Sequence, residues 1–153
     1  MILRCYVLNL SANIRKKVLL ISFYIVFLHV LNSKCDMKKI LVAEDTESNF
    51  LLLSIILRKE YEVLRAYNGA EAVEICRDNC PDLVLMDIKM PIMDGLEATK
   101  SIRQFNKELI IIALTANAYD SDREKAFEAG CNDYMAKPVM APKLREMISR
   151  YLG

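Results

Sequence analysis

Short apolar runs alternate regularly with amphipathic segments from residue 39 to the C-terminus, and this alternation constrains the fold more than any other feature. The runs are rich in branched side chains, as buried strands are, and the segments between them carry apolar residues at helical spacing. This order predicts a doubly wound α/β domain, with a parallel sheet and helices on both of its faces. The five expected strands cover residues 39–43, 62–66, 83–86, 109–114 and 131–136, and the expected helices cover 48–59, 70–79, 95–104, 121–129 and 141–152.

The apolar residues of the expected helices predict which faces turn toward the sheet. In the first helix, Leu52, Ile55 and Ile56 have the i, i+3, i+4 spacing of a core-facing stripe. In the last helix, four residues are expected on one face for the same reason: Leu144, Met147, Ile148 and Tyr151. We therefore expect the first and last helices to pack through these residues.

Composition and charge exclude several classes of protein. A length of 153 residues suits one domain with a substantial core. The chain has 21 basic and 20 acidic residues, so nothing in its net charge indicates direct binding of nucleic acid. Five cysteines without a Cys-x-x-Cys pair, together with a single histidine, argue against a disulfide framework and a zinc site. Reduced thiols and a cytoplasmic location are the expectation.

Residues 1–36 form a leader that does not match the pattern of residues 37–153. Its apolar run, residues 18–31, follows a basic cluster but is shorter than the roughly 20 residues that a membrane span needs. A signal peptide would fit the length, yet no cleavage site of small residues follows. The interpretation we favour is that Met37 is the true initiator and that the leader is upstream sequence included in an over-long gene assignment. Membrane association is expected only if the leader is a real anchor.

Polar side chains follow four of the expected strands at the point where each strand ends. They are Glu44 and Asp45, Asp87, Thr115, and Lys137. The carboxyl ends of parallel strands share one edge of the sheet, so these residues can converge there, although each one alone is more often a loop cap or a solvated surface residue. Three close carboxylates repel one another, and Mg²⁺, which prefers oxygen ligands, relieves that repulsion. The sequence therefore predicts a magnesium site at this edge.

The remaining groups at this edge are suited to phosphoryl chemistry. The ammonium group of Lys137, the hydroxyl of Thr115 and a bound cation together form a receptor for a tetrahedral oxyanion. Asp87, at the tip of the central apolar run, is then a carboxylate nucleophile that can become an aspartyl phosphate.

Over residues 37–153 the sequence resembles the receiver domains of two-component response regulators. The resemblance implies a flavodoxin-like (CheY-like) three-layer sandwich with strand order 2-1-3-4-5, an order that the alternation alone does not give. The residues that carry it are Glu44 and Asp45, Met86 and Asp87, Met90 and Pro91, Asp94 and Gly95, Thr115 and Ala116, Tyr134, and Lys137 and Pro138.

The resemblance also implies the reaction and its cofactor. Asp87 would take a phosphoryl group from a histidine kinase or a histidine phosphotransfer protein, in a phosphorelay that depends on Mg²⁺. The ion would be held by Asp45, Asp87 and the backbone carbonyl of Lys89, with Glu44 acting through water. The domain would catalyse only its own phosphorylation and dephosphorylation, so we do not expect it to be an enzyme in the usual sense.

Further roles follow from the same resemblance. Thr115 and Lys137 would bind the phosphoryl oxygens, and small Ala116 would leave access to them. Tyr134 would turn inward when Thr115 moves, changing the surface of the last strand and helices. The peptide bond before Pro138 is expected to be cis.

Partners and rival functions remain as expectations. The phosphodonor is expected to dock on the first helix near Asn49 and Leu52 and on the loop after Pro138; the sequence does not identify the downstream partner. Because the chain ends after the last helix, we expect a stand-alone receiver without an output domain, or one cut from a hybrid kinase. An aspartyl-phosphate hydrolase would usually carry a second acid at position 89, where lysine stands, and a dinucleotide-binding domain would need a glycine-rich first loop. A degenerate receiver used only for docking would have lost some of the acidic residues.

Overall fold

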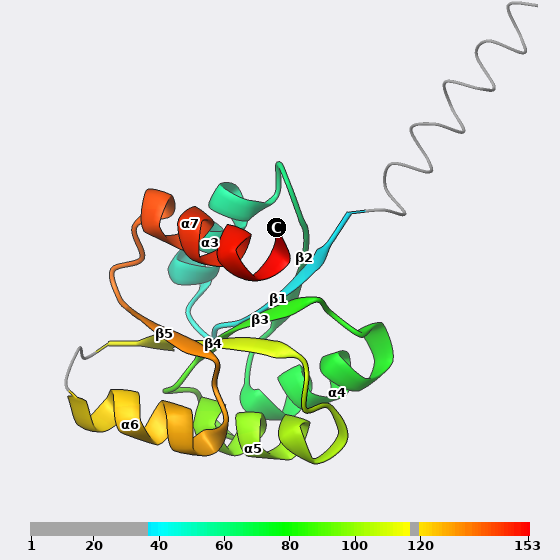
Figure 1. Ribbon diagram of the computed structural model, residues 1–153, viewed down its shortest axis with the longest axis vertical. Coiled ribbons are helices and arrows are strands. Elements are labelled where there is room, and N and C mark those ends of the chain that lie inside the picture. Colours follow the sequence, from blue (N-terminus) through cyan, green and yellow to red (C-terminus); the bar gives the residue numbers. More distant parts are fainter. Residues whose placement is uncertain (1–36, 117–119) are drawn as a thin grey trace, which may run out of the picture. The chain divides into compact units, whose positions relative to one another are not determined.

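Five parallel strands form a sheet in the order β2-β1-β3-β4-β5 (Figure 1). The computed structural model describes residues 37–116 and 120–153, so the predicted leader, residues 1–36, lies outside the described residues. The strands are β1 (Lys39–Ala43), β2 (Glu62–Ala66), β3 (Leu83–Asp87), β4 (Ile110–Thr115) and β5 (Asp133–Ala136). The helices are α3 (Glu47–Leu57), α4 (Gly69–Asn79), α5 (Gly95–Phe105), α6 (Asp120–Ala129) and α7 (Ala141–Leu152). The predicted fold class and strand order are confirmed.

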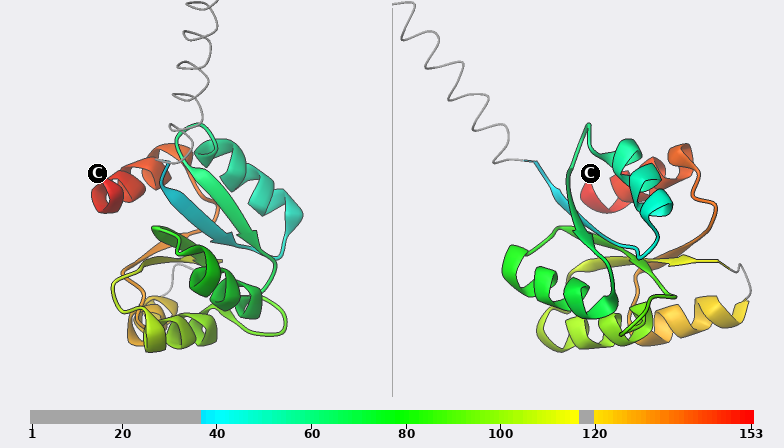
Figure 2. Two further views of the ribbon diagram at one scale, coloured as in Figure 1. Left: turned by 90° about the vertical axis from the view of Figure 1, so that its right-hand side faces the viewer. Right: turned by 180° about the vertical axis from the view of Figure 1, so that it is seen from behind.

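The helices cover the two faces of the sheet unequally. Helices α3 and α7 lie on one face, and α4, α5 and α6 lie on the other (Figures 1 and 2). Alternate residues of β1 supply the two cores: Ile40 and Val42 pack with α3 and α7, while Leu41 and Ala43 pack with the other three helices. Both faces of the central strands are therefore dry, which explains their continuous apolar sequence.

The fifth strand begins two residues later than expected, at Asp133. The backbone N–H of Cys131 donates to the carbonyl of Ala126, and that of Gly130 donates to Phe127, in the pattern that closes a helix with a left-handed residue. Gly130 has φ 104°, as this closure requires. Cys131 therefore belongs to the end of α6, and the ladder with β4 starts beyond it.

The expected core face of α3 is partly wrong. Leu52 and Ile55 are 47% and 48% exposed, whereas Leu53, Ile56 and Leu57 are buried. The helix is apolar on nearly all sides, so more than one set of its residues has the spacing of a core-facing stripe. Packing against the sheet selects one of these sets and leaves the other in solvent.

The last helix packs as expected, with Leu144, Met147 and Ile148 buried against the same core as α3. Among residues 37–116 and 120–153, no helix combines the length and apolar character needed to cross a bilayer.

Candidate functional site

The polar residues predicted at the strand ends lie along one edge of the sheet. Glu44 and Asp45 follow β1, Asp87 ends β3, Thr115 ends β4, and Lys137 follows β5. The strands are parallel and in register from β1 to β5, so their carboxyl ends come level with one another. The sheet thus gathers side chains that are far apart in the sequence.

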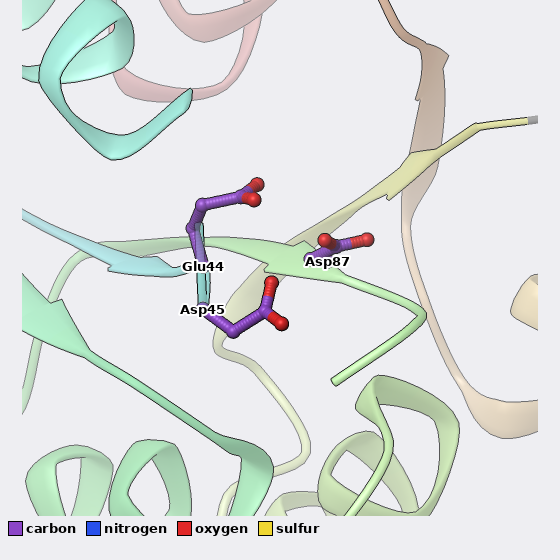
Figure 3. Close-up of side chains that lie close together, drawn as sticks. All are labelled: Glu44, Asp45 and Asp87. Atoms are coloured by element: carbon purple, nitrogen blue, oxygen red, sulfur yellow. The ribbon is translucent and has the colours of Figure 1, made fainter. Parts of the chain in front are cut away.

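Three carboxylates form the acidic part of this site (Figure 3). Glu44, Asp45 and Asp87 each offer an oxygen within 4.8 Å of the others. Glu44 and Asp87 are buried, with 0% and 6% exposure, while Asp45 is open to solvent. An all-oxygen donor set with one open side fits Mg²⁺, which keeps part of its water shell when it binds protein. The residues present therefore fit the expected ion.

Lys137 joins two of these acids directly. Its Nζ atom lies 2.6 Å from Oε2 of Glu44 and 2.7 Å from Oδ2 of Asp87, and its side chain is 19% exposed. Burial lowers the pKa of Lys137, but its hydrogen bonds to Asp87 and Glu44 and their charges outweigh that effect, so the pKa is raised overall. The ammonium group therefore stays protonated between the two carboxylates.

Burial raises the pKa of Asp87, whereas it acts to lower the pKa of Lys137. Desolvation is the largest effect and raises the pKa of its carboxyl, and the charge of Glu44 adds to it. The hydrogen bond and charge of Lys137, and the backbone N–H of Lys89, act to lower the pKa without cancelling the rise. The N–H of Lys89 lies 3.2 Å from Oδ1 of Asp87. Asp87 is thus a carboxylate in a site that favours additional positive charge.

Thr115 lies on the strand next to Asp87 and is buried, with 4% exposure. Its carbonyl accepts a hydrogen bond from the backbone N–H of Lys137 at 2.8 Å, so β4 helps to position the backbone of Lys137. The peptide bond between Lys137 and Pro138 is cis, as expected. Ala116 is exposed beside Thr115.

Tyr134 lies on β5, half-buried, on the same face of the sheet as Thr115. It pairs with Ala113, two residues before Thr115, and side chains two apart on a strand share a face. Its ring meets that of Phe127 edge to face, with centroids 6.2 Å apart, and the guanidinium of Arg123 lies 5.3 Å from its ring centre. Tyr134 therefore contacts α6 through its ring and lies beside β4, on the face of the sheet that also carries Thr115.

The loop after Asp87 is pressed against the strand tip. The backbone N–H of Gly95 donates to the carbonyl of Ile88 at 2.9 Å, and a Cβ atom at Gly95 would overlap the carbonyl oxygen of Asp87. Only glycine fits at this start of α5. The side chain of Lys89 is exposed, and the role expected of its carbonyl stays a prediction.

The sequence prediction missed one contact in the site. Asn49, in the first turn of α3, donates from Nδ2 to Oε1 of Glu44 at 2.9 Å. Asn49 was expected near a docking surface and not as a partner of Glu44. The available signal was a run of three polar residues, Glu47 to Asn49, at the start of an otherwise mostly apolar helix, and it does not say which residue the amide of Asn49 contacts.

A doubly wound sheet with an acidic cluster and a lysine at its carboxyl edge is the framework of a phosphoacceptor domain. The family model described as "Response regulator receiver domain" matches residues 40–149. The chain belongs to this family, and it is a phosphoacceptor in two-component signal transduction.

Relatives and solved structures agree with this assignment. The polar-differentiation response regulator DivK of Brucella anthropi is 39% identical over 119 residues, which make up 76% of this chain and 97% of that protein. The receiver domain of the sensor histidine kinase PA1611 from Pseudomonas aeruginosa PAO1, solved with magnesium coordinated in its active site cleft, is 38% identical, with a TM-score of 0.72; the match covers 76% of this chain and 98% of that one. The receiver domain of Saccharomyces cerevisiae Ssk1, solved with the histidine phosphotransfer protein Ypd1, is 36% identical, with a TM-score of 0.71, over 75% of this chain and 88% of that one.

Replacing Gly95 by alanine tests how tightly the loop holds the strand tip. The new Cβ atom would push the carbonyl of Asp87, so we expect the free energy of unfolding to fall by about 1–3 kcal/mol, as overpacking usually costs. Urea denaturation measures the change. Glu97→Ala, an exposed position in the same turn, is the control and should stay within about 0.5 kcal/mol of wild type. A more stable Gly95→Ala protein, which helix propensity alone would give, would contradict the close approach.

Proposed function

We propose that Asp87 is the residue that accepts the phosphoryl group, and that a phosphorylated histidine is its donor. The observation that carries this proposal is the position of the Asp87 carboxylate, 6% exposed at the tip of β3 and 2.7 Å from the ammonium group of Lys137. An Asp87 oxygen would form the new bond to phosphorus while the bond to the donor imidazole nitrogen breaks and its electrons return to the ring. The Lys137 ammonium and the Thr115 hydroxyl would bind the phosphoryl oxygens.

Magnesium is part of this proposal. Asp45, Asp87 and the carbonyl of Lys89 would hold the ion, and Glu44 would act through water. The ion would neutralise the charge that gathers as the phosphoryl group arrives beside three carboxylates. The magnesium in the active site cleft of the PA1611 receiver supports a magnesium ion at the acidic cluster of this chain.

The domain acts on itself under this proposal and is not an enzyme in the usual sense. Each phosphoryl transfer consumes the carboxylate of Asp87, and a further transfer requires hydrolysis of the aspartyl phosphate. We infer that this happens in the cytoplasm, because Cys76, Cys80 and Cys131 are free thiols, as is usual in a reducing compartment.

The proposed output is a change in the surface along the β5 edge of the sheet, which α6 and α7 flank on either side. A phosphoryl group on Asp87 would draw the Thr115 hydroxyl toward it and leave room beside β4. Tyr134, on the same face of the sheet, would then turn inward and leave Phe127 and Arg123. That exchange would alter the surface offered to a downstream protein.

The donor is proposed to dock on the outer face of α3 and the loop after Pro138. Leu51, Leu52 and Ile55 are 53%, 47% and 48% exposed, and Met140 is 62% exposed. A pocket whose walls include Leu52, Pro138 and Val139 opens beside Glu44 and Lys137, so this apolar surface adjoins the acidic site. A contiguous exposed apolar surface is typical of a protein-binding face. The complex of the Ssk1 receiver with Ypd1 supports a histidine phosphotransfer protein or kinase as the partner class.

Mass spectrometry after incubation with acetyl phosphate and Mg²⁺ tests the acceptor. Wild type is expected to gain one phosphoryl group, and Asp87→Asn is expected to gain none because its amide is not a nucleophile. Asp94→Asn is the matched control, since asparagine caps α5 as well as aspartate does. Equal labelling of Asp87→Asn and wild type would exclude Asp87 as the acceptor.

Truncation of the α3 face tests the docking surface. Leu52→Ala with Ile55→Ala is expected to slow transfer from the histidine kinase that labels wild type fastest by about tenfold or more, since each truncation loses on the order of 1 kcal/mol of apolar burial. Labelling by acetyl phosphate should not change. Phe105→Ala, which removes an exposed aromatic ring from α5, serves as the control. Equal transfer to wild type and to the double variant would refute this surface.

The exposed cationic side chain of Lys89, two residues after Asp87, is expected to hinder the water that hydrolyses the aspartyl phosphate. We predict a long-lived phosphorylated form, and severalfold faster decay in Lys89→Asn. The decay is followed after removal of the donor, with Lys100→Asn as a control at another exposed lysine. Equal or slower decay in Lys89→Asn would contradict the prediction.

A further inference from the structure

Glu44 is the most enclosed charged group of the site, with 0% exposure. Each of its carboxylate oxygens has one partner. Oε1 accepts a hydrogen bond from Nδ2 of Asn49 at 2.9 Å, and Oε2 pairs with Nζ of Lys137 at 2.6 Å. A buried carboxylate requires such partners, because water cannot replace them without opening the structure.

These contacts form a continuous chain from α3 to the proposed acceptor. Asn49 holds Glu44, Glu44 holds Lys137, and Lys137 reaches Asp87 at 2.7 Å. The lysine side chain is flexible, so the place of its ammonium group is set by the carboxylates that it meets. Of the two carboxylates that Lys137 contacts, Glu44 is the one that also accepts a hydrogen bond from a neutral side chain, that of Asn49.

We propose that Asn49 is a positioning residue for phosphoryl transfer, acting through Glu44 on Lys137. This inference rests on the proposed function of Asp87 and Lys137. Asn49 locks the rotamer of Glu44, and Glu44 then presents the Lys137 ammonium where it meets both Asp87 and the incoming phosphoryl oxygens. The amide suits this role because it donates a hydrogen bond to Glu44 without adding charge to an already acidic pocket.

Loss of Asn49 has two opposite consequences. Oε1 of Glu44 loses its partner, so the carboxylate turns to another one and the ammonium of Lys137 is no longer held at one point. The carboxylates that would bind magnesium remain, and Glu44 becomes freer to turn toward the ion. Phosphorylation should therefore slow while magnesium affinity is kept or increased. A variant that merely damaged the fold would weaken both together.

The experiment uses the full chain and acetyl phosphate, a small donor that does not need the α3 docking face. For Asn49→Ala and Asn49→Leu we expect the maximal rate of phosphorylation at saturating Mg²⁺ to fall about 10- to 100-fold, since a misplacement of about 1 Å in an active site costs up to that factor. The acetyl phosphate concentration for half-maximal rate should change little. Calorimetric titration should give a magnesium dissociation constant no weaker than that of wild type. Ser48→Ala, exposed in the same helical turn, is the control and should behave as wild type.

A second measurement observes Lys137 directly. In wild type the ¹⁵N-labelled ammonium group of Lys137 should give an NMR signal protected from exchange with water, and in Asn49→Ala that protection should be lost. An unchanged maximal rate, or a fall in rate matched by an equal loss of magnesium affinity, would overturn the proposal, as would a Lys137 signal that stays protected. If wild type itself is not labelled by acetyl phosphate, the proposed function fails, while the NMR comparison still tests whether Asn49 holds the chain of contacts.

Discussion

The site depends on one cation, the ammonium group of Lys137, which two buried acids share. Glu44 and Asp87 are both withdrawn from water, where two neighbouring acidic groups need a counter-charge between them. The ammonium group of Lys137 supplies that charge at 2.6 and 2.7 Å. It also ties the end of β5 to the ends of β1 and β3 across the sheet. The same contact therefore places a positive charge between the acidic groups and links the ends of β1, β3 and β5 to one another.

The parallel sheet makes this contact possible. Because β1 and β3 are neighbours and β3 pairs with β4, residues separated by more than forty positions meet at one edge. Helices cover both faces of these strands, so the side chains along the strands are apolar and the polar side chains of the site follow at the strand ends. The close approach of Gly95 to the backbone of Asp87 then restrains the end of β3, which carries the proposed acceptor.

Most of the fold and the members of the acidic cluster could be predicted from the sequence, because strand ends, turn residues and helix ends are local signals. The strand order could not, since alternation alone fits several orders, and it came from the resemblance. The buried face of α3 was mistaken because Leu52 and Leu53 are equally apolar and only packing distinguishes them. The contact between Asn49 and Glu44 was missed for a similar reason: a side-chain amide has many potential partners until the fold brings one within reach.

Helix α3 has apolar side chains both in the core and on the surface. Leu53, Ile56 and Leu57 are locked into the core, where changes of volume are costly, while Leu51, Leu52 and Ile55 face solvent and contribute little to folding. If the phosphodonor docks there as proposed, substitutions on the outer side would alter which kinase is recognised at little cost in stability. Duplicated copies of such a domain would then diverge in signalling specificity through a few surface changes, while the interior and the chemistry stay as they were.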